Sequence, residues 1–288
     1  MTAARTPWNI RVAPYLFVLP NMLIFGVFTI WPAINNVTIS AYDSTNGRTF
    51  TYAGTSNYTE LVRSADFWAA ARATAIFAVC FVVLCTIGAI GLALLLDRRL
   101  RGRGAFRAIF FLPVLLSPVV VGLIWGWILD RRNGLANTLL GADVPWLVDG
   151  RLAMAAVVFV GLWTHLGFYA LIILAGLQGI DPNHHAAAMI DGASAWQRLR
   201  YITLPLLRPT TMVVVILSMI AGFQAFDFIW TLTGGGPIGA TTLMVQYIYQ
   251  NAFQSPIRYG LAAAGSVILF CTVFGLTLIN VLLDRRPA

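Results

Sequence analysis

Six long apolar runs, separated by shorter polar segments, dominate the pattern of the chain. They lie near residues 13–38, 73–96, 106–129, 152–178, 207–231 and 260–283. A run of about 18 or more apolar residues is long enough to cross the hydrocarbon core of a membrane as an α-helix. The pattern therefore predicts an all-α, polytopic transmembrane helical bundle with six spans, in which residues 1–288 form a single domain.

The composition supports a membrane protein. Hydrophobic residues make up 59% of the chain and charged residues 10%, whereas about a quarter of the residues of a soluble domain are charged. The basic excess, 19 residues against 11 acidic ones, fits membrane topology better than nucleic-acid binding in so apolar a chain. Because the chain contains no lysine, it cannot form a Walker A phosphate-binding loop of its own.

The distribution of arginine predicts the orientation. With the N-terminus in the cytoplasm, the cytoplasmic segments contain twelve of the 19 basic residues. The outer segments contain seven, roughly balanced by six acidic residues. Short cytoplasmic loops are enriched in arginine and lysine, and the cluster at 98–107 carries most of this signal. We therefore expect both termini to be cytoplasmic.

The segment between the fourth and fifth runs, residues 179–206, contains signals for two short helices rather than a flexible connector. Asp181 before a proline is a typical N-cap and first-turn pair, and the alanines that follow propagate a helix well. Gly192 suits the left-handed position just past a helix end. Ser194 and Gln197 then form a capping box for a second helix.

Such a loop has more than one physical interpretation. A short helix with a small-residue face and exposed apolar side chains suits docking into a groove on another protein. An amphipathic helix that lies on the lipid surface, or one that merely covers the bundle, has the same pattern. The pattern alone leaves these alternatives open.

The residue order in this loop resembles a known motif. Its parts are Ala187-Ala188-Met189-Ile190-Asp191-Gly192-Ala193, Trp196-Gln197 and Ile202-Thr203-Leu204-Pro205. The segment is similar to the EAA coupling loop of binding-protein-dependent ABC importer permeases, which inserts into a cleft on a separate cytoplasmic ATPase. The resemblance implies ATPase-coupling contacts from His185, Ala186, Ala187, Ala188, Asp191, Gly192, Ala193 and Trp196. One departure is that Ala186 stands where the motif usually has glutamate, so a salt bridge through that glutamate has no counterpart here.

The resemblance extends over nearly the whole chain. It is carried by Ala13-Pro14-Tyr15-Leu16-Phe17-Val18-Leu19-Pro20, by Phe110-Phe111-Leu112-Pro113 with Trp125, and by Thr233-Gly234-Gly235-Gly236-Pro237 with Tyr247-Ile248-Tyr249. These segments look like the sugar-importing branch, and the Gly-Gly-Pro sequence looks like the first of its two permeases, of the maltose or glycerophosphate type. The resemblance implies the type I ABC importer permease fold in a bacterial cytoplasmic membrane.

The implied assembly contains this chain, a second and different permease subunit, a cytoplasmic ATPase dimer and an extracytoplasmic solute-binding protein. This chain would form half of the translocation pathway for a sugar or sugar-like solute, such as a disaccharide, an amino sugar or a glycerophosphodiester. The resemblance implies no cofactor in this chain, because ATP and Mg²⁺ are bound by the partner ATPase.

Polar side chains in the predicted spans indicate where a solute could pass, since such groups usually face a cavity or a partner. In the related permeases the solute contacts come from the fourth and fifth spans, which here contain Trp163, His165, Tyr169, Phe223, Gln224, Phe226 and Asp227. Rings that cover the apolar faces of a sugar, with amides and carboxylates for its hydroxyls, are a usual binding mode. Two alternatives stay open: His165 bonds a neighbouring helix, and Asp227 pairs with an arginine of the second permease.

Two other classes of function explain less of the chain. An ion-coupled secondary transporter would tend to show inverted repeats and a midplane carboxylate; Asp227 supplies only the second, and the loop at 179–206 would have no role. A membrane-embedded enzyme requires a cluster of nucleophiles, acids or metal ligands. His184 and His185 point about 100° apart on a helix, so they do not form an i, i+4 metal pair. We therefore expect no catalytic site and no metal site.

Overall fold

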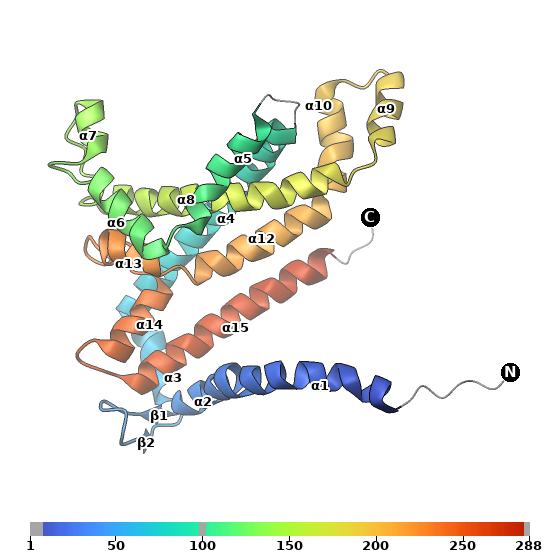
Figure 1. The fold of residues 1–288 in the computed structure, drawn as a ribbon. Coiled ribbons are helices and arrows are strands. Elements are labelled where there is room, and N and C mark those ends of the chain that lie inside the picture. Colours follow the sequence, from blue (N-terminus) through green and yellow to red (C-terminus); the bar gives the residue numbers. More distant parts are fainter. Residues whose placement is uncertain (1–7, 98–101, 285–288) are drawn as a thin grey trace. The chain divides into compact units, whose positions relative to one another are not determined.

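The computed structural model describes residues 8–97 and 102–284, which are mostly helical (Figure 1). The elements, with η for 3₁₀- or π-helical segments, are α1 (Trp8–Phe25), η1 (Gly26–Ile30), α2 (Trp31–Ile39), β1 (Tyr42–Asp43), β2 (Thr51–Tyr52), α3 (Ser56–Arg63), α4 (Ala65–Asp97), α5 (Arg103–Phe111), η2 (Leu112–Leu115), α6 (Pro118–Ile128), α7 (Leu135–Leu140), α8 (Gly150–Gln178), α9 (Pro182–Ile190), α10 (Ala195–Arg198), η3 (Leu199–Thr203), α11 (Leu204–Leu206), α12 (Arg208–Phe223), α13 (Asp227–Thr233), α14 (Met244–Phe253) and α15 (Tyr259–Asp284). The arginines used above for orientation at positions 5, 98, 99, 101, 285 and 286 lie outside the described residues.

The number of candidate membrane spans agrees with the predicted six. Four helices are long and apolar enough to cross a membrane, namely Pro14–Ile39, Ala65–Asp97, Gly150–Gln178 and Tyr259–Leu282. Two helix pairs satisfy the same criterion together but are bent, by 100° between Gly104–Leu115 and Pro118–Ile128 and by 65° between Ala195–Leu206 and Arg208–Phe223. With each pair counted as one span, the described residues contain up to six spans.

The third predicted run, 106–129, is broken where two prolines interrupt it. Pro113 lies in η2, and Pro118 is the first residue of α6. Between them, Leu116 and Ser117 have extended backbone, with ψ angles of 145° and 130°. The ring of a proline disfavours the helical conformation of the residue before it, so Pro118 explains why the first half of the span ends.

The fifth predicted run, 207–231, is not one continuous helix, contrary to the hydrophobic pattern. Helix α12 ends at Phe223 and α13 begins at Asp227. Between them the backbone of Phe226 leaves the helical region, with φ of −149° and ψ of −61°. No proline or glycine lies at 224–226, so the local sequence carries no signal for this break.

The packing of α13 against α6 supplies a physical reason for the break. A Cβ atom on Gly122 of α6 would lie 1.9 Å from Oγ1 of Thr231 in α13. The Thr231 hydroxyl lies 3.3 Å from the carbonyl oxygen of Val119 in α6 and 3.1 Å from that of Asp227 in its own helix. Close approach at a glycine lets α13 bury Phe228 and Ile229, which a straight continuation of α12 would place elsewhere.

The described residues form two compact units, one of which comprises 64–97, 102–247 and 269–284. In this unit α4, α8 and α12 pack together; Figure 1 shows α8 and α12 side by side with α4 crossing them. Helix α4 contributes a stripe of buried residues at every fourth position, which winds slowly round the helix because four residues make slightly more than one turn of 3.6 residues. These residues are Ala73, Phe77, Phe81, Cys85, Ala89 and Ala93.

The other unit comprises residues 8–63 and 248–268. After α2 the chain forms an antiparallel hairpin, in which Tyr42 pairs with Tyr52. The buried Asn57 of α3 donates from Nδ2 to the carbonyl oxygens of Ser40 at 3.0 Å and Tyr42 at 2.9 Å. The segment between α2 and α4 is therefore locally folded, and it ends where α4 begins at Ala65.

Candidate functional site

The first helix of the loop at 179–206 is capped at both ends as predicted. At its start the Asp181 carboxylate accepts a hydrogen bond of 2.9 Å from the backbone N–H of Asn183. At its end Gly192 is left-handed, with φ of +76°. Its N–H donates to the carbonyl of Met189 at 3.1 Å, and the N–H of Ala193 donates to Ala188 at 2.8 Å. These two bonds form a Schellman motif, so α9 is terminated by its own backbone.

The second helix of the loop begins with the predicted capping box. The Ser194 N–H donates to Oε1 of Gln197 at 2.7 Å, and the Gln197 N–H donates to Oγ of Ser194 at 3.3 Å. The helix then continues through α10, η3 and α11 as far as Leu206. The turn at Leu207, before Pro209 in α12, separates it from the next helix. The end of this helix therefore lies past Pro205, which is inside α11.

The loop presents small and apolar side chains on its surface. Figure 1 shows α9 and α10 projecting beyond the end of α8. Large exposed side chains include Ile190, 86% exposed, and Trp196, 68% exposed. Of the other predicted coupling residues, Ala186, Ala187, Asp191 and Gly192 are exposed, His185 and Ala193 are half-buried, and Ala188 is buried. The predicted residues therefore form a mostly accessible surface on two capped helices.

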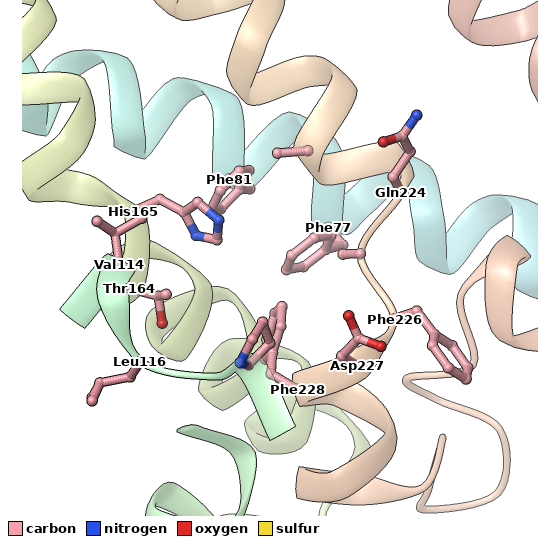
Figure 2. A pocket seen from close by; sticks show the side chains of 13 residues that line it. Phe77, Phe81, Val114, Leu116, Thr164, His165, Gln224, Phe226, Asp227 and Phe228 are labelled. Carbon is pink, nitrogen blue, oxygen red and sulfur yellow. The ribbon is translucent and has the colours of Figure 1, made fainter. Parts of the chain in front are cut away.

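A second candidate site is a cavity of about 240 Å³ that lies where two helices are interrupted, between α5 and α6 and between α12 and α13 (Figure 2). Its lining comes from α4, the bend between α5 and α6, α8, and the α12–α13 junction. Four of the seven predicted solute-pathway residues line it, namely His165, Gln224, Phe226 and Asp227. The break in the fifth run therefore places polar side chains at a cavity rather than along a continuous helix face.

Aromatic rings form one wall of this cavity. The rings of Phe77 and Phe81 are stacked, with centroids 5.5 Å apart. The His165 ring meets Phe81 edge-on, also at 5.5 Å between centroids. A Cβ atom on Gly161 would lie 3.3 Å from the Phe81 ring, so this glycine lets the ring pack closely on α8. The wall is assembled from two helices that are far apart in sequence.

The other three predicted solute-pathway residues do not line the cavity. Trp163 packs edge-on against Trp125, with ring centroids 5.4 Å apart. Tyr169 is buried and stacks on His165, with centroids 6.0 Å apart. Phe223 is half-buried at the end of α12. A direct contact of these three side chains with a solute stays a prediction.

The polar lining has a defined pattern of hydrogen bonds. Thr164 Oγ1 donates to the carbonyl oxygen of Val160 at 2.8 Å. His165 Nδ1 lies 3.0 Å from the carbonyl oxygen of Gly161, so this ring nitrogen has its partner on its own helix. Asp227 and Gln224 are both exposed. In Figure 2 the Gln224 amide extends away from the rings, whereas the Asp227 carboxylate points toward them.

Sequence reasoning missed the lining residues outside the fourth and fifth runs. Phe77 and Phe81 come from α4, Leu116 comes from the bend before α6, and Pro118 is the first residue of α6. The spacing of Phe77 and Phe81 within the stripe on α4 identifies one buried face, yet it does not indicate which other helix that face meets. Pro118 is identifiable as a helix breaker, but its place in the same cavity lining as Asp227 depends on tertiary packing.

Comparison with known families decides what kind of membrane protein this is. The family described as binding-protein-dependent transport system inner membrane component matches residues 90–288, more than two thirds of the chain. The chain belongs to this family of ABC importer permeases. The permease therefore has a multi-pass location in the inner membrane and is not an enzyme. Membership also decides against an ion-coupled secondary transporter.

Relatives resemble the permease along nearly its whole length. The trehalose/maltose transport system permease protein MalF of Thermococcus litoralis is 35% identical over 278 residues, covering 94% of this chain and 93% of the relative. The sn-glycerol-3-phosphate transport system permease protein UgpA of Agrobacterium fabrum is 33% identical over 280 residues, covering 93% and 92%.

A solved structure has the same fold. It is a bacterial ABC transporter involved in the import of the acidic polysaccharide alginate, and it matches with a TM-score of 0.84 at 24% identity, covering 96% of this chain and 97% of the other. The permease therefore has the type I ABC importer permease fold that was predicted.

Proposed function

We propose that this permease is the first of two permease subunits in an importer for a sugar or sugar-like solute, and that the cavity at the helix breaks is part of the solute pathway. The observation that carries this proposal is the combination of stacked rings from α4 with Asp227 and His165 in one cavity. Rings suit the apolar faces of a sugar, and polar side chains suit its hydroxyls. The sugar-transport names of the relatives support the solute class.

The cavity has the size of a partial site. Its volume of about 240 Å³ is below the roughly 300–1,000 Å³ of typical small-molecule sites. In a heterodimeric permease, the second subunit would complete it. Phe226 lies at the α12–α13 junction with its ring stacked against Trp230, 5.8 Å between centroids, so a rigid aromatic pair stands beside the exposed Asp227.

The loop at 179–206 is proposed to couple the permease to the ATPase. A docking surface that transmits motion must be rigid. The Schellman motif at Gly192 and the capping box at Ser194 stabilise both helices through local hydrogen bonds. The exposed Ile190 and Trp196 offer apolar area, and the exposed Ala186 and Ala187 allow close approach to a groove. Ala186 removes any ion pair that a glutamate would make there.

The proposed assembly contains a second permease, an ATPase dimer that binds ATP and Mg²⁺, and an extracytoplasmic solute-binding protein. A bacterial alginate ABC transporter of similar fold has been solved in complex with an alginate pentasaccharide-bound periplasmic protein, which supports the last of these partners. The excess of arginine in the predicted inner segments supports cytoplasmic termini. In this mechanism ATP binding closes the ATPase dimer, the docked loop moves, and the two permeases open outward; hydrolysis resets them.

The assembly is tested by affinity purification of the tagged chain from its native membrane in mild detergent, followed by mass spectrometry. We expect a second permease and an ATPase to co-purify. A chain that is recovered alone from intact membranes would contradict the proposed assembly.

The solute pathway is tested with Asp227→Asn and Gln224→Ala in the complete importer. A hydrogen bond to a charged group contributes about 1.5–3 kcal/mol, so we expect Asp227→Asn to lower uptake at limiting solute by roughly ten-fold or more. Gln224→Ala should have a smaller effect, because its amide extends away from the rings. Asp66→Asn, an exposed acid in the first turn of α4, is the control. Unchanged rates and solute preference in both cavity variants would refute the pathway.

A further inference from the structure

The polar groups that line the cavity are mostly hydrogen-bond acceptors. A threonine hydroxyl has one proton to donate, and Thr164 already donates it to the carbonyl of Val160, 2.8 Å away within its own helix. Toward the cavity, Thr164 can therefore offer only the lone pairs of its oxygen. A solute hydroxyl can donate to these lone pairs, whereas a phosphate or carboxylate oxygen cannot.

His165, like Thr164, presents a hydrogen-bond acceptor to the cavity. Its Nδ1 lies 3.0 Å from the carbonyl oxygen of Gly161. A carbonyl can only accept, so Nδ1 must carry the proton, and in a neutral imidazole Nε2 is then an acceptor. The ring is held in this orientation by its stacking on Tyr169 and its edge contact with Phe81. The hydrogen bond to Gly161 therefore selects the tautomer that accepts from a solute.

The charged and amide groups extend the pattern. Asp227 is a carboxylate, which as an anion only accepts, and it points toward the rings (Figure 2). Gln224 has the one side-chain amide that can donate among the described lining residues, and it extends away from the rings. These described lining residues include no arginine, and the chain has no lysine. The described lining residues of this chain therefore offer a negative charge and acceptors, and no arginine or lysine among them can pair with an anion.

We propose that the cavity selects solutes that donate hydrogen bonds and carry no negative charge, namely neutral polyhydroxylated sugars, and rejects phosphorylated or uronic-acid sugars. The inference rests on the proposed function, because it requires the cavity to lie in the solute pathway. The inference distinguishes between two classes of solute that occur in the names of relatives. One relative is named for trehalose and maltose, which are neutral, and another for sn-glycerol-3-phosphate, which is anionic.

One feature of the cavity, the N-terminus of α13, favours anions. The first backbone N–H groups of α13 lie at the junction, and a helix N-terminus attracts negative charge. However, Asp227 is itself in that first turn, so its carboxylate already offsets the positive end of the helix. An incoming phosphate would meet this carboxylate within the same turn, and like charges close together repel.

The experiment measures solute affinity of the permease pair in lipid nanodiscs, with no binding protein present, by quenching of tryptophan fluorescence. The probes are a panel of neutral disaccharides, including trehalose and maltose, their counterparts oxidised to the uronic acid at C6, and sn-glycerol 3-phosphate. We expect the tightest neutral probe to bind at least ten-fold more strongly than its uronic counterpart. In Asp227→Arg, which supplies a cation and five donors, that ratio should fall at least ten-fold.

Two further variants keep the test decisive. Asp227→Asn removes the charge at the same size, so it should lower the ratio even if Asp227→Arg does not fold. Asp66→Arg makes the same charge reversal in the first turn of α4, away from the cavity, and should leave the ratio unchanged. Preference for an anionic probe in the wild-type permease, or a ratio that is the same in all variants, overturns the inference.

The outcomes separate this inference from the proposed function. Normal uptake of a neutral sugar by the complete importer, with a ratio insensitive to Asp227, overturns charge selection at the cavity and leaves the sugar importer standing. Absence of uptake for every sugar probe, together with no quenching, overturns both.

Discussion

The loop at 179–206 and the cavity at the helix breaks are built by opposite means. Each helix of the loop is held by residues a few positions apart, such as Asp181 with Asn183 and Ser194 with Gln197. The cavity combines side chains from positions as distant as Phe77 and Phe228, whose rings have centroids 6.4 Å apart. The loop's shape is therefore encoded locally, whereas the cavity exists only when several helices pack.

The difference affects how each region responds to mutation. Local caps contribute about 1 kcal/mol each, and losing one loosens a single turn. Where two helices touch at a glycine, an added Cβ atom clashes with the backbone of the neighbouring helix. That backbone can move away only if its whole helix moves. We therefore expect the largest effects at glycines that admit a neighbouring backbone, and the smallest at exposed polar pairs.

The largest effect is expected for Gly167→Ala in α8. A Cβ atom there would lie 1.8 Å from the carbonyl oxygen of Phe110 and 2.3 Å from its carbonyl carbon, so α5 would have to move away and the cavity wall with it. We expect a loss of about 3 kcal/mol or more in stability, measured as a lower thermal midpoint in detergent. Gly91→Ala in α4 is the control, since a Cβ atom there would meet nothing within 4 Å. Equal midpoints for the two variants would show that tight packing does not hold the cavity.

The next effect is expected for Gly192→Pro in the loop. Gly192 has φ of +76°, whereas proline is locked near −65°, so the Schellman motif cannot form. We expect uptake per ATP hydrolysed to fall at least ten-fold in the reconstituted importer, while the chain stays in the membrane. Gly192→Asn should retain coupling, because asparagine tolerates the left-handed conformation. Normal coupling of ATP hydrolysis to uptake in Gly192→Pro would contradict the proposal that the loop must be rigid.

A smaller effect is expected for Ser194→Ala, which deletes one half of the capping box. The loss should be about 1 kcal/mol, confined to the second helix of the loop. Hydrogen exchange of the amides at 195–203 should accelerate about five-fold, with no change in α9 or α8. A change that spread to α8 would mean that the loop is not an independent local structure.

The smallest effect is expected at the ion pair of Glu60 with Arg258, which is distant in sequence but exposed, with 48% and 31% of the two side chains accessible. The hydrogen bond from Arg258 lowers the pKa of Glu60 below its ordinary value of 4.5. The pair therefore stabilises above pH 4.5, and that contribution is lost as the pH falls through the lowered pKa. Solvent screening limits it to less than about 1 kcal/mol.

Glu60→Gln should remove this pH dependence. The difference in thermal midpoint between wild type and variant should be small at pH 7 and vanish near pH 3. A large difference in thermal midpoint at pH 7 would mean that an exposed contact between residues distant in sequence can contribute as much to stability as a buried one.

Sequence reasoning recovered the loop more completely than the cavity. The N-cap at Asp181, the left-handed Gly192 and the capping box at Ser194 were all predicted, because each depends on residues within one or two turns. The break between Phe223 and Asp227 was missed, since Gln-Ala-Phe contains no helix breaker. The roles of Asp227 in solute contact and of Ala187 in docking stay predictions.

The sequence by itself determined the number of spans, the kink at Pro118 and the two capped helices of the loop, because apolar length, proline and capping chemistry act over a few residues. Only the tertiary structure decided that Phe81 meets His165, that α13 turns onto Gly122, and that a cavity rich in acceptors forms between them. Such contacts depend on which helix faces pack together, and in a chain that is apolar on nearly every face the hydrophobic pattern cannot distinguish one partner from another.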